Sequence, residues 1–160
     1  MNDDDLSDAY GGFAAVDGRQ SETAAAVSQG VRRLFRASGI ASVIEFTLGN
    51  GRRADVAGLA MDGLFHIVEI KSSYQDFRVD QKWPEYVEFC DYFYFAAPPD
   101  LEPAIFPQNT GLIVADSYGA EIVRPAVLDK ISSARRRAIL LRFAQFAANQ
   151  LHSIHDPKTG

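Results

Sequence analysis

Three ionisable side chains occupy places where a core strand ordinarily holds apolar residues. In the segment Ile67-Val68-Glu69-Ile70-Lys71, the glutamate and the lysine are two residues apart, so both project from one face of an expected strand. Asp55 lies within another apolar run, Ala54-Asp55-Val56-Ala57. Burial of such charges without partners is costly. A divalent cation shared by the two carboxylates, with a lysine beside it, would be one partner that also has a chemical use.

Two glycine-containing turns decide whether these carboxylates share a face. As three-residue hairpin loops that end in glycine, Gly49-Asn50-Gly51 and Met61-Asp62-Gly63 place Asp55 opposite both Glu45 and Glu69. A two-residue turn at positions 62 and 63 would instead send the two carboxylates to opposite faces. The favoured registers bring one set of charged side chains to a single patch: Glu45, Asp55, Glu69, Lys71 and Arg53.

Carboxylate oxygens of this kind suit Mg²⁺ or Mn²⁺, which keep several waters and bind phosphate oxygens. We expect Asp55 and Glu69 to hold one ion that polarises a scissile phosphate and activates a water. Lys71 would orient that water or offset charge on the phosphoryl oxygens. For Glu45 two interpretations stay open, a ligand or water-positioning group and a solvated strand residue.

The elements that must position this patch follow from hydrophobic periodicity and turn signals. We expect a helix, a three-stranded antiparallel meander, a second helix, a fourth strand, a later hairpin and a closing helix. This order predicts an α/β fold with a mixed sheet flanked by helices. The expected ranges are 23–38, 41–48, 53–59, 64–72, 80–90, 92–97, 111–115, 120–123 and 133–151.

The charged residues also match a known signature. Asp55, thirteen intervening residues and Glu69-Ile70-Lys71 resemble the D-(x)n-E-x-K signature of the PD-(D/E)XK nuclease superfamily, although Ala54 replaces its proline. The order of expected elements is similar to the restriction-endonuclease-like core of that superfamily. The wider sequence resembles the MmcB-like family of bacterial proteins, regarded as DNA-repair endonucleases, over roughly residues 21–151. The segments that carry this resemblance are 45–48, 50–56, 68–73, 76–78, 82–86 and 111–116.

The resemblance implies a metal-dependent nuclease-type site that acts on DNA in repair. Asp55 and Glu69 would be its metal ligands and Lys71 its catalytic lysine. Because a fold does not guarantee an activity, two other functions stay open. One is a catalytically silent nuclease-fold protein that binds DNA or serves as a repair scaffold, and the other is an RNA-processing factor.

Four residues near this patch are candidates for contact with nucleic acid. Arg52 and Arg53 could bind phosphate or pair with neighbouring carboxylates. Lys82 and Trp83 open the second helix, where a nucleic-acid backbone would lie in such a fold, and the indole could stack on a base or belong to the core. Nearby, Asp76 and Asp80 are candidates for helix caps.

The net charge of −5 at first argues against a nucleic-acid partner. The first 22 residues, however, contain six acidic residues and one arginine, so they carry the whole excess. Arginines gather instead at the end of the first helix, where Arg32, Arg33 and Arg36 suit the helix dipole and could also face phosphate.

The chain length and composition predict one globular domain over residues 21–151. A flexible acidic arm over 1–20 would precede it and a frayed tail over 152–160 would follow. With one cysteine, no signal-peptide pattern and no long apolar run, we expect a cytoplasmic protein without membrane contact. Other repair proteins are possible partners, and the sequence leaves the oligomeric state open.

Overall fold

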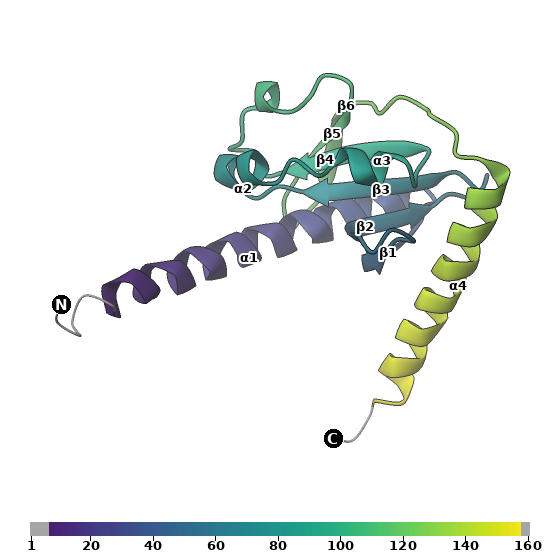
Figure 1. The fold of residues 1–160 in the computed structure, drawn as a ribbon, viewed down its shortest axis with the longest axis horizontal. Coiled ribbons are helices and arrows are strands. Elements are labelled where there is room, and N and C mark those ends of the chain that lie inside the picture. Colours follow the sequence, from purple (N-terminus) through teal and green to yellow (C-terminus); the bar gives the residue numbers. More distant parts are fainter. Residues whose placement is uncertain (1–6, 158–160) are drawn as a thin grey trace.

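The computed structural model describes the backbone of residues 7–157 and the side chains of residues 22–157. Its centre is a six-stranded sheet in the order β1-β2-β3-β4-β5-β6 (Figure 1). The strands are β1 (Ala41–Thr47), β2 (Arg53–Leu59), β3 (Phe65–Ile70), β4 (Tyr92–Ala97), β5 (Gly111–Ala115) and β6 (Ala120–Arg124). The helices are α1 (Ser7–Ala37), α2 (Tyr74–Val79), α3 (Pro84–Val87) and α4 (Ser133–His155), with a 3₁₀ turn, η2, at Pro103–Ile105.

The sheet is mixed, as predicted. β1, β2 and β3 form an antiparallel meander, β3, β4 and β5 run parallel, and β5 and β6 form an antiparallel hairpin. The predicted registers are confirmed by the recorded pairs Ile44 with Val56 and Val56 with Val68. Gly51 and Gly63 adopt φ values of 83° and 85°, the left-handed conformation that ends each three-residue loop.

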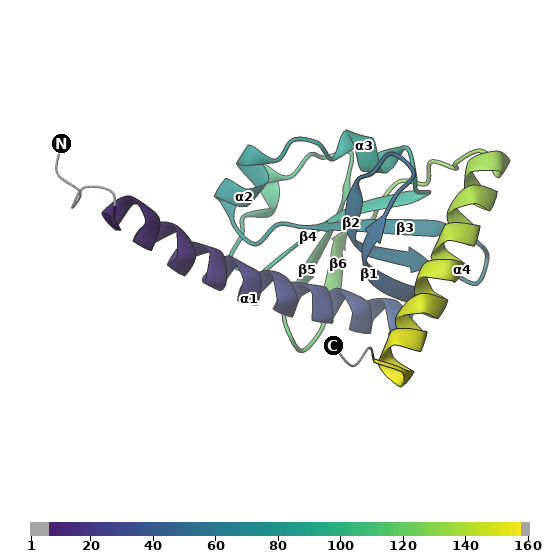
Figure 2. The ribbon, with the colours of Figure 1, turned by 60° about the horizontal axis from the view of Figure 1, so that its bottom comes forward.

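Helices cover both faces of the sheet. Figures 1 and 2 show α1 along one face and α2 and α3 on the other, with α4 near β1. α1 buries Val27, Val31 and Phe35 against Val56 and Val68. Complete burial of such side chains stabilises a fold by about 1.5 to 3 kcal/mol each, so this stripe fixes α1 to the sheet.

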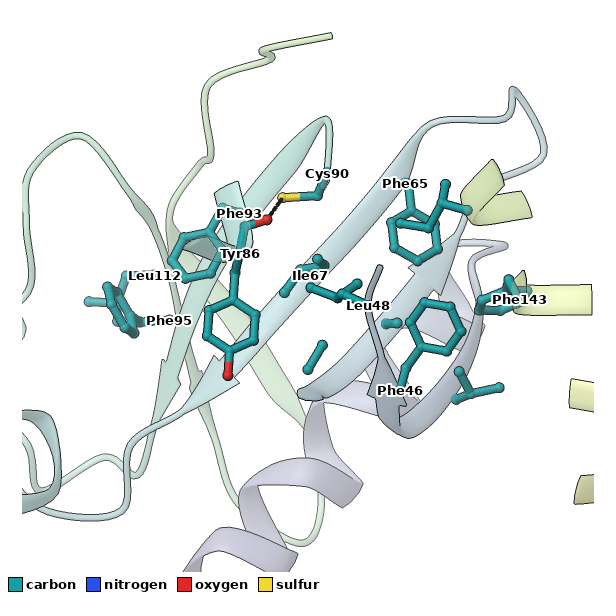
Figure 3. Packing of buried hydrophobic residues seen from close by; sticks show 14 of the residues in the cluster. Phe46, Leu48, Phe65, Ile67, Tyr86, Cys90, Phe93, Phe95, Leu112 and Phe143 are labelled. Atoms are coloured by element: carbon teal, nitrogen blue, oxygen red, sulfur yellow. Dashed lines mark hydrogen bonds between the residues drawn. The ribbon is translucent and has the colours of Figure 1, made fainter. Parts of the chain in front are cut away.

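The opposite face has an aromatic core (Figure 3). Phe143 of α4 meets Phe46 and Phe65 edge to face, with ring centroids 5.8 Å apart in both pairs. The same helix is held by Arg136, whose guanidinium makes two hydrogen bonds of 2.7 Å to the buried carboxylate of Asp91. A paired and hydrogen-bonded charge of this kind gives α4 a defined position on the sheet.

The predicted bounds of the first and last helices are wrong. α1 begins at Ser7 rather than near Thr23, because extending a formed helix costs less than nucleating one. Residues 7–20 of the predicted acidic arm are therefore helical, and residues 1–6 lie outside the described part. α4 continues to His155, beyond the expected end at Leu151, while residues 158–160 of the predicted tail are not described.

The helix predicted over 80–90 is also wrong, because only a short helix lies within that range and another short helix precedes it. α3 covers only Pro84–Val87, and Asp80 has an extended backbone (φ −111°, ψ 100°). α2, which sequence reasoning missed, begins after Ser73, whose hydroxyl accepts the N–H of Asp76. Serine three residues before an acidic residue is a helix-start signal that could have located it.

Candidate active site

The two predicted metal ligands meet where β2 and β3 separate. Recorded backbone pairing between these strands stops at Val56 and Val68. Beyond that pair, Oε1 of Glu69 accepts the backbone N–H of Asp55 at 3.2 Å, and Oδ2 of Asp55 accepts the N–H of Ile70 at 2.8 Å. The carboxylates thus take the place of backbone hydrogen bonds between β2 and β3. The two acidic side chains lie side by side where the strands diverge, a place that we call the fork.

Burial makes both carboxylates costly to ionise. Glu69 is 4% exposed, and its burial, followed by the negative charge of Asp55, raises its pKa to about 9. Burial also raises the pKa of Asp55, although the N–H of Ile70 and the charge of Lys71 oppose that shift. A buried pair of like charges needs a proton or a cation between its members.

Lys71 is buried next to the fork and has a defined partner. Its side chain is 4% exposed, and Nζ donates to Oδ2 of Asp80 at 2.9 Å. Partial burial opposes ionisation of Asp80, but the hydrogen bonds from Lys71 and from the N–H of Lys82 outweigh it and lower the pKa of Asp80. Asp80 therefore holds the lysine head in place instead of capping a long helix.

Glu45 lies on the other side of Asp55, with a left-handed backbone. Its φ of 53° is the one positive value among the non-glycine residues of the described chain. It has no recorded pair with Asp55, although its neighbours Ile44 and Phe46 pair with β2. Such a conformation costs on the order of 1 kcal/mol or more and often occurs at functional sites.

These groups line one open cleft of about 820 Å³ between α1 and the sheet end. All five residues of the predicted patch, Arg53 included, line it, so the structure brings that patch together. The cleft also contains small residues of α1 and polar groups of the segment after β3. Its lining residues are Ala24, Ala25, Ser28, Ile44, Glu45, Gly51, Arg52, Arg53, Asp55, Glu69, Ile70, Lys71, Asp76, Asp80 and Tyr86.

The four nucleic-acid candidates separate into two groups. Arg52 and Arg53 line the cleft, but Arg52 forms an ion pair with Glu85. Trp83 does not line it, because its ring packs at 5.9 Å from both Phe93 and Phe95 in the aromatic core. Lys82 is exposed and also lies outside the lining.

Besides Asp80, sequence reasoning did not assign Tyr86 and Asp76 of the cleft to the site. Tyr86 is buried in the aromatic core (Figure 3), yet its hydroxyl donates to the carbonyl of Arg53 at 3.2 Å. Burial and then the charges of Glu69 and Asp55 raise its pKa. The carboxylate of Asp76 accepts the N–H of Ser72, and its own N–H donates to Ser73, so the cap of α2 is Ser73 and not Asp76 as predicted. The available signal for Tyr86 was its place in the segment 82–86, which carries part of the family resemblance.

The donor set fits a hard divalent cation. In the part of the chain that the structure describes, no cluster of three or more His, Cys, Asp or Glu forms a ready-made metal cage. Mg²⁺ commonly needs only one or two carboxylates, because waters and substrate phosphates complete its shell. Asp55 and Glu69 supply such a pair, and their mutual repulsion is what a cation would remove.

No helix among the described residues is long and apolar enough to cross a membrane. Comparison with curated proteins finds no match for the chain. A solved structure of a protein of unknown function from Silicibacter pomeroyi is similar over 86% of this chain and 94% of its own, with 39% identity and a TM-score of 0.83. The model of the family described as DNA repair protein MmcB-like matches residues 12–158. With that match over almost its whole length, the chain belongs to the MmcB-like family of DNA repair proteins.

Proposed function

We propose that this DNA repair protein is a metal-dependent endonuclease that hydrolyses phosphodiester bonds in DNA. The observation that supports the proposal most is the fork in which Asp55 and Glu69 lie together, with the buried ammonium group of Lys71 beside them. Burial of three such ionisable groups has no evident benefit for stability. It is, however, what hydrolysis of a phosphodiester needs, because the transition state is stabilised mainly by positioned charges.

Four residues of the cleft would have separate roles in this reaction. Asp55 and Glu69 would hold Mg²⁺ or Mn²⁺, which when bound supplies a Lewis acid for a phosphoryl oxygen and a water of lowered pKa. The ammonium group of Lys71 has three donors, and its bond to Asp80 uses one. The others can orient the attacking water or donate to the phosphoryl oxygens. Glu45, across from Asp55, can position that water.

Asp80 is a positioning residue in this proposal. Without it, Lys71 would lose its recorded hydrogen bond and its head would be free to pair with Asp55 or Glu69. That pairing would compete with the cation for the same carboxylates.

The test measures cleavage of single-stranded, duplex, flapped and mismatched DNA with Mg²⁺ or Mn²⁺. We expect the wild type to cleave and Asp55→Asn and Lys71→Met each to lose about 100-fold or more in rate, as when one transition-state donor is removed. Asp100→Asn, an exposed acidic residue outside the cleft, is the matched control and should cleave normally. Circular dichroism checks that each variant is folded.

The opposite result is also informative. DNA binding by the wild type without cleavage under any of these conditions would rule out the endonuclease and favour the catalytically silent scaffold. Equal cleavage by the wild type and both site variants would place the chemistry elsewhere.

A further inference from the structure

One stripe of α1 leads away from the cleft. Ala25 and Ser28 line the cleft, and Arg32 and Arg36 follow them at spacings of four residues. Residues three and four apart lie on the same side of a helix, so these four form one line along α1. At 1.5 Å per residue, the line from Ser28 to Arg36 is about 12 Å long.

The surface beside this line is hollowed. A depression of about 360 Å³ between α1 and the start of β1 is lined by Arg32, Arg36 and Ser42, among others. A second, of about 530 Å³, lies between α1, β1 and the end of α4 and also includes Arg32. The β1 residue that lines this second depression, Ile44, lines the cleft as well. Each hollow thus shares one lining residue with the next, so the three adjoin in a row. We call this path the arginine groove where it lies outside the cleft.

The charge of the path changes along its length. The cleft is lined by five carboxylates, whereas no acidic side chain lines the arginine groove. Arg32 and Arg36 are both exposed, and their guanidinium groups have no recorded hydrogen bond or ion pair within the described chain. Arg33 differs, because Nη1 donates to the carbonyl of Tyr118 at 3.3 Å. The remaining lining is neutral: Gln29, Ile40, Ala41, Ser42, Ile44, Asn149, Gln150, Ser153 and Ile154.

We propose that the arginine groove binds the sugar–phosphate backbone of DNA that flanks the scissile bond, with Arg32 and Arg36 on successive phosphates. This inference rests on the proposed function for the place of the scissile bond. Guanidinium groups are the preferred donors to phosphate, and neutral amide and hydroxyl groups commonly complete such contacts. Because the groove offers arginines to the backbone, it would bind without regard to base sequence.

The arginine groove would also offset the electrostatic repulsion between the cleft and DNA. Its carboxylates repel a phosphodiester, and the net charge of the chain is −5. A short basic path that joins the cleft would hold the strand while the reacting phosphate enters the acidic end. The helix dipole accounts for basic residues in the last turn of α1, but it does not account for their alignment with the cleft.

The experiment measures DNA binding by fluorescence anisotropy in EDTA, so that no cleavage takes place. The probes are one labelled duplex and one labelled single strand, each at several salt concentrations. The test variant is Arg32→Gln with Arg36→Gln, and a second variant, Arg32→Lys with Arg36→Lys, keeps the charge. Arg137→Gln with Arg142→Gln removes the same charge from exposed positions of α4 outside the groove and is the matched control.

We expect the glutamine variant to bind on the order of tenfold more weakly at 0.1 M salt. Its plot of log affinity against log salt should be shallower by about 1 to 2, because two phosphate contacts are lost. The lysine variant should keep most of the affinity and the wild-type slope, and the α4 control should bind like the wild type.

Three results would contradict DNA binding in the arginine groove. They are no DNA binding by the wild type, equal binding by the wild type and the glutamine variant, or an equal loss of affinity in the α4 control. The last would mean that total charge matters and the path does not. Failure of the endonuclease proposal is distinct, because it would appear as a wild type that binds through Arg32 and Arg36 but cleaves nothing when Mg²⁺ is added.

Discussion

The pair Asp55 and Glu69 shows how single residues can be placed against their own preference for water. Each carboxylate accepts a backbone N–H from the neighbouring strand, and such bonds favour the charged form. Burial and mutual repulsion nevertheless prevail at Glu69, whose pKa rises to about 9. At neutral pH the metal-free site therefore retains a proton that the unfolded chain would have released.

This difference predicts how stability depends on pH. The pKa of Glu69 is raised on folding, so its contribution to stability is complete below the ordinary value of 4.5 and is lost as pH rises towards about 9. In EDTA, the wild type should thus have a lower melting temperature at pH 8 than Glu69→Gln, which carries no charge there. Below pH 4.5 the two melting temperatures should converge.

The measurement is thermal unfolding from pH 4 to 9, with Glu102→Gln, an exposed residue, as the control. A wild type that is as stable as Glu69→Gln at pH 8 would contradict the raised pKa.

At the scale of elements, the position of α1 determines both the cleft and the arginine groove. Gly30 lets this helix approach the turn between β5 and β6. A Cβ atom at residue 30 would lie 2.2 Å from the carbonyl oxygen of Asp116 and 2.5 Å from that of Gly119. Both neighbours are backbone atoms, which cannot rotate aside as a long side chain can. α1 must therefore shift if this residue gains a side chain.

Gly30→Ala is accordingly expected to destabilise the protein, although alanine favours a helix by about 1 kcal/mol over glycine. Overpacking of this severity typically costs about 1 to 3 kcal/mol. Because α1 would also move relative to β1, DNA binding through the arginine groove should weaken as well. Urea denaturation measures the stability change, and Gly119→Ala, which adds the same Cβ where nothing lies within 4 Å, serves as the control. An unchanged or higher midpoint for Gly30→Ala would show that α1 is not fixed at this contact.

The segment between β3 and β4 also shows where local sequence rules are overridden. A single helix over 80–90 satisfied the periodicity of Trp83, Val87 and Cys90, and these three residues do belong to one core cluster. The helix nevertheless covers only Pro84–Val87, because contacts on either side limit it: Asp80 turns its carboxylate to Lys71, and the N–H of Asp91 bonds to the carbonyl of Phe65. Tertiary contacts thus shortened the helix while its apolar face was preserved.

At the scale of the whole molecule, an acidic cleft and a net charge of −5 are at odds with a phosphate-binding function until a cation is present. Anything that binds the folded state alone stabilises it, by about 2.7 kcal/mol when a ligand is at 100 times its Kd. For a domain of this size, that corresponds to a melting temperature about 5 to 10 °C higher.

We therefore expect Mg²⁺ or Mn²⁺ at saturating concentration to raise the melting temperature of the wild type at pH 7.5, relative to NaCl of equal ionic strength. Asp55→Asn should show little or no rise, since one ligand is lost. Asp62→Asn, on the exposed β2–β3 turn, should behave like the wild type. A rise of equal size in Asp55→Asn would mean that the ion binds elsewhere.

The sequence by itself determined the meander and its registers. Loops of fixed length that end in glycine permit few pairings, and burial of one face rejects a shift by one residue. That was enough to place Glu45, Asp55 and Glu69 on neighbouring strands. Membership of the MmcB-like family was also evident in the residues, because long matching segments surround the short signature.

Only the tertiary structure decided the surroundings of that patch. Asp80 as the partner of Lys71, Tyr86 as a wall of the cleft, and the alignment of Arg32 and Arg36 with the cleft depend on contacts between elements distant in sequence. Local propensity contains no information about such contacts, since each of these residues is equally compatible with an ordinary cap, core or solvated position. Packing of α1 and of the segment after β3 against the sheet selected one position for each.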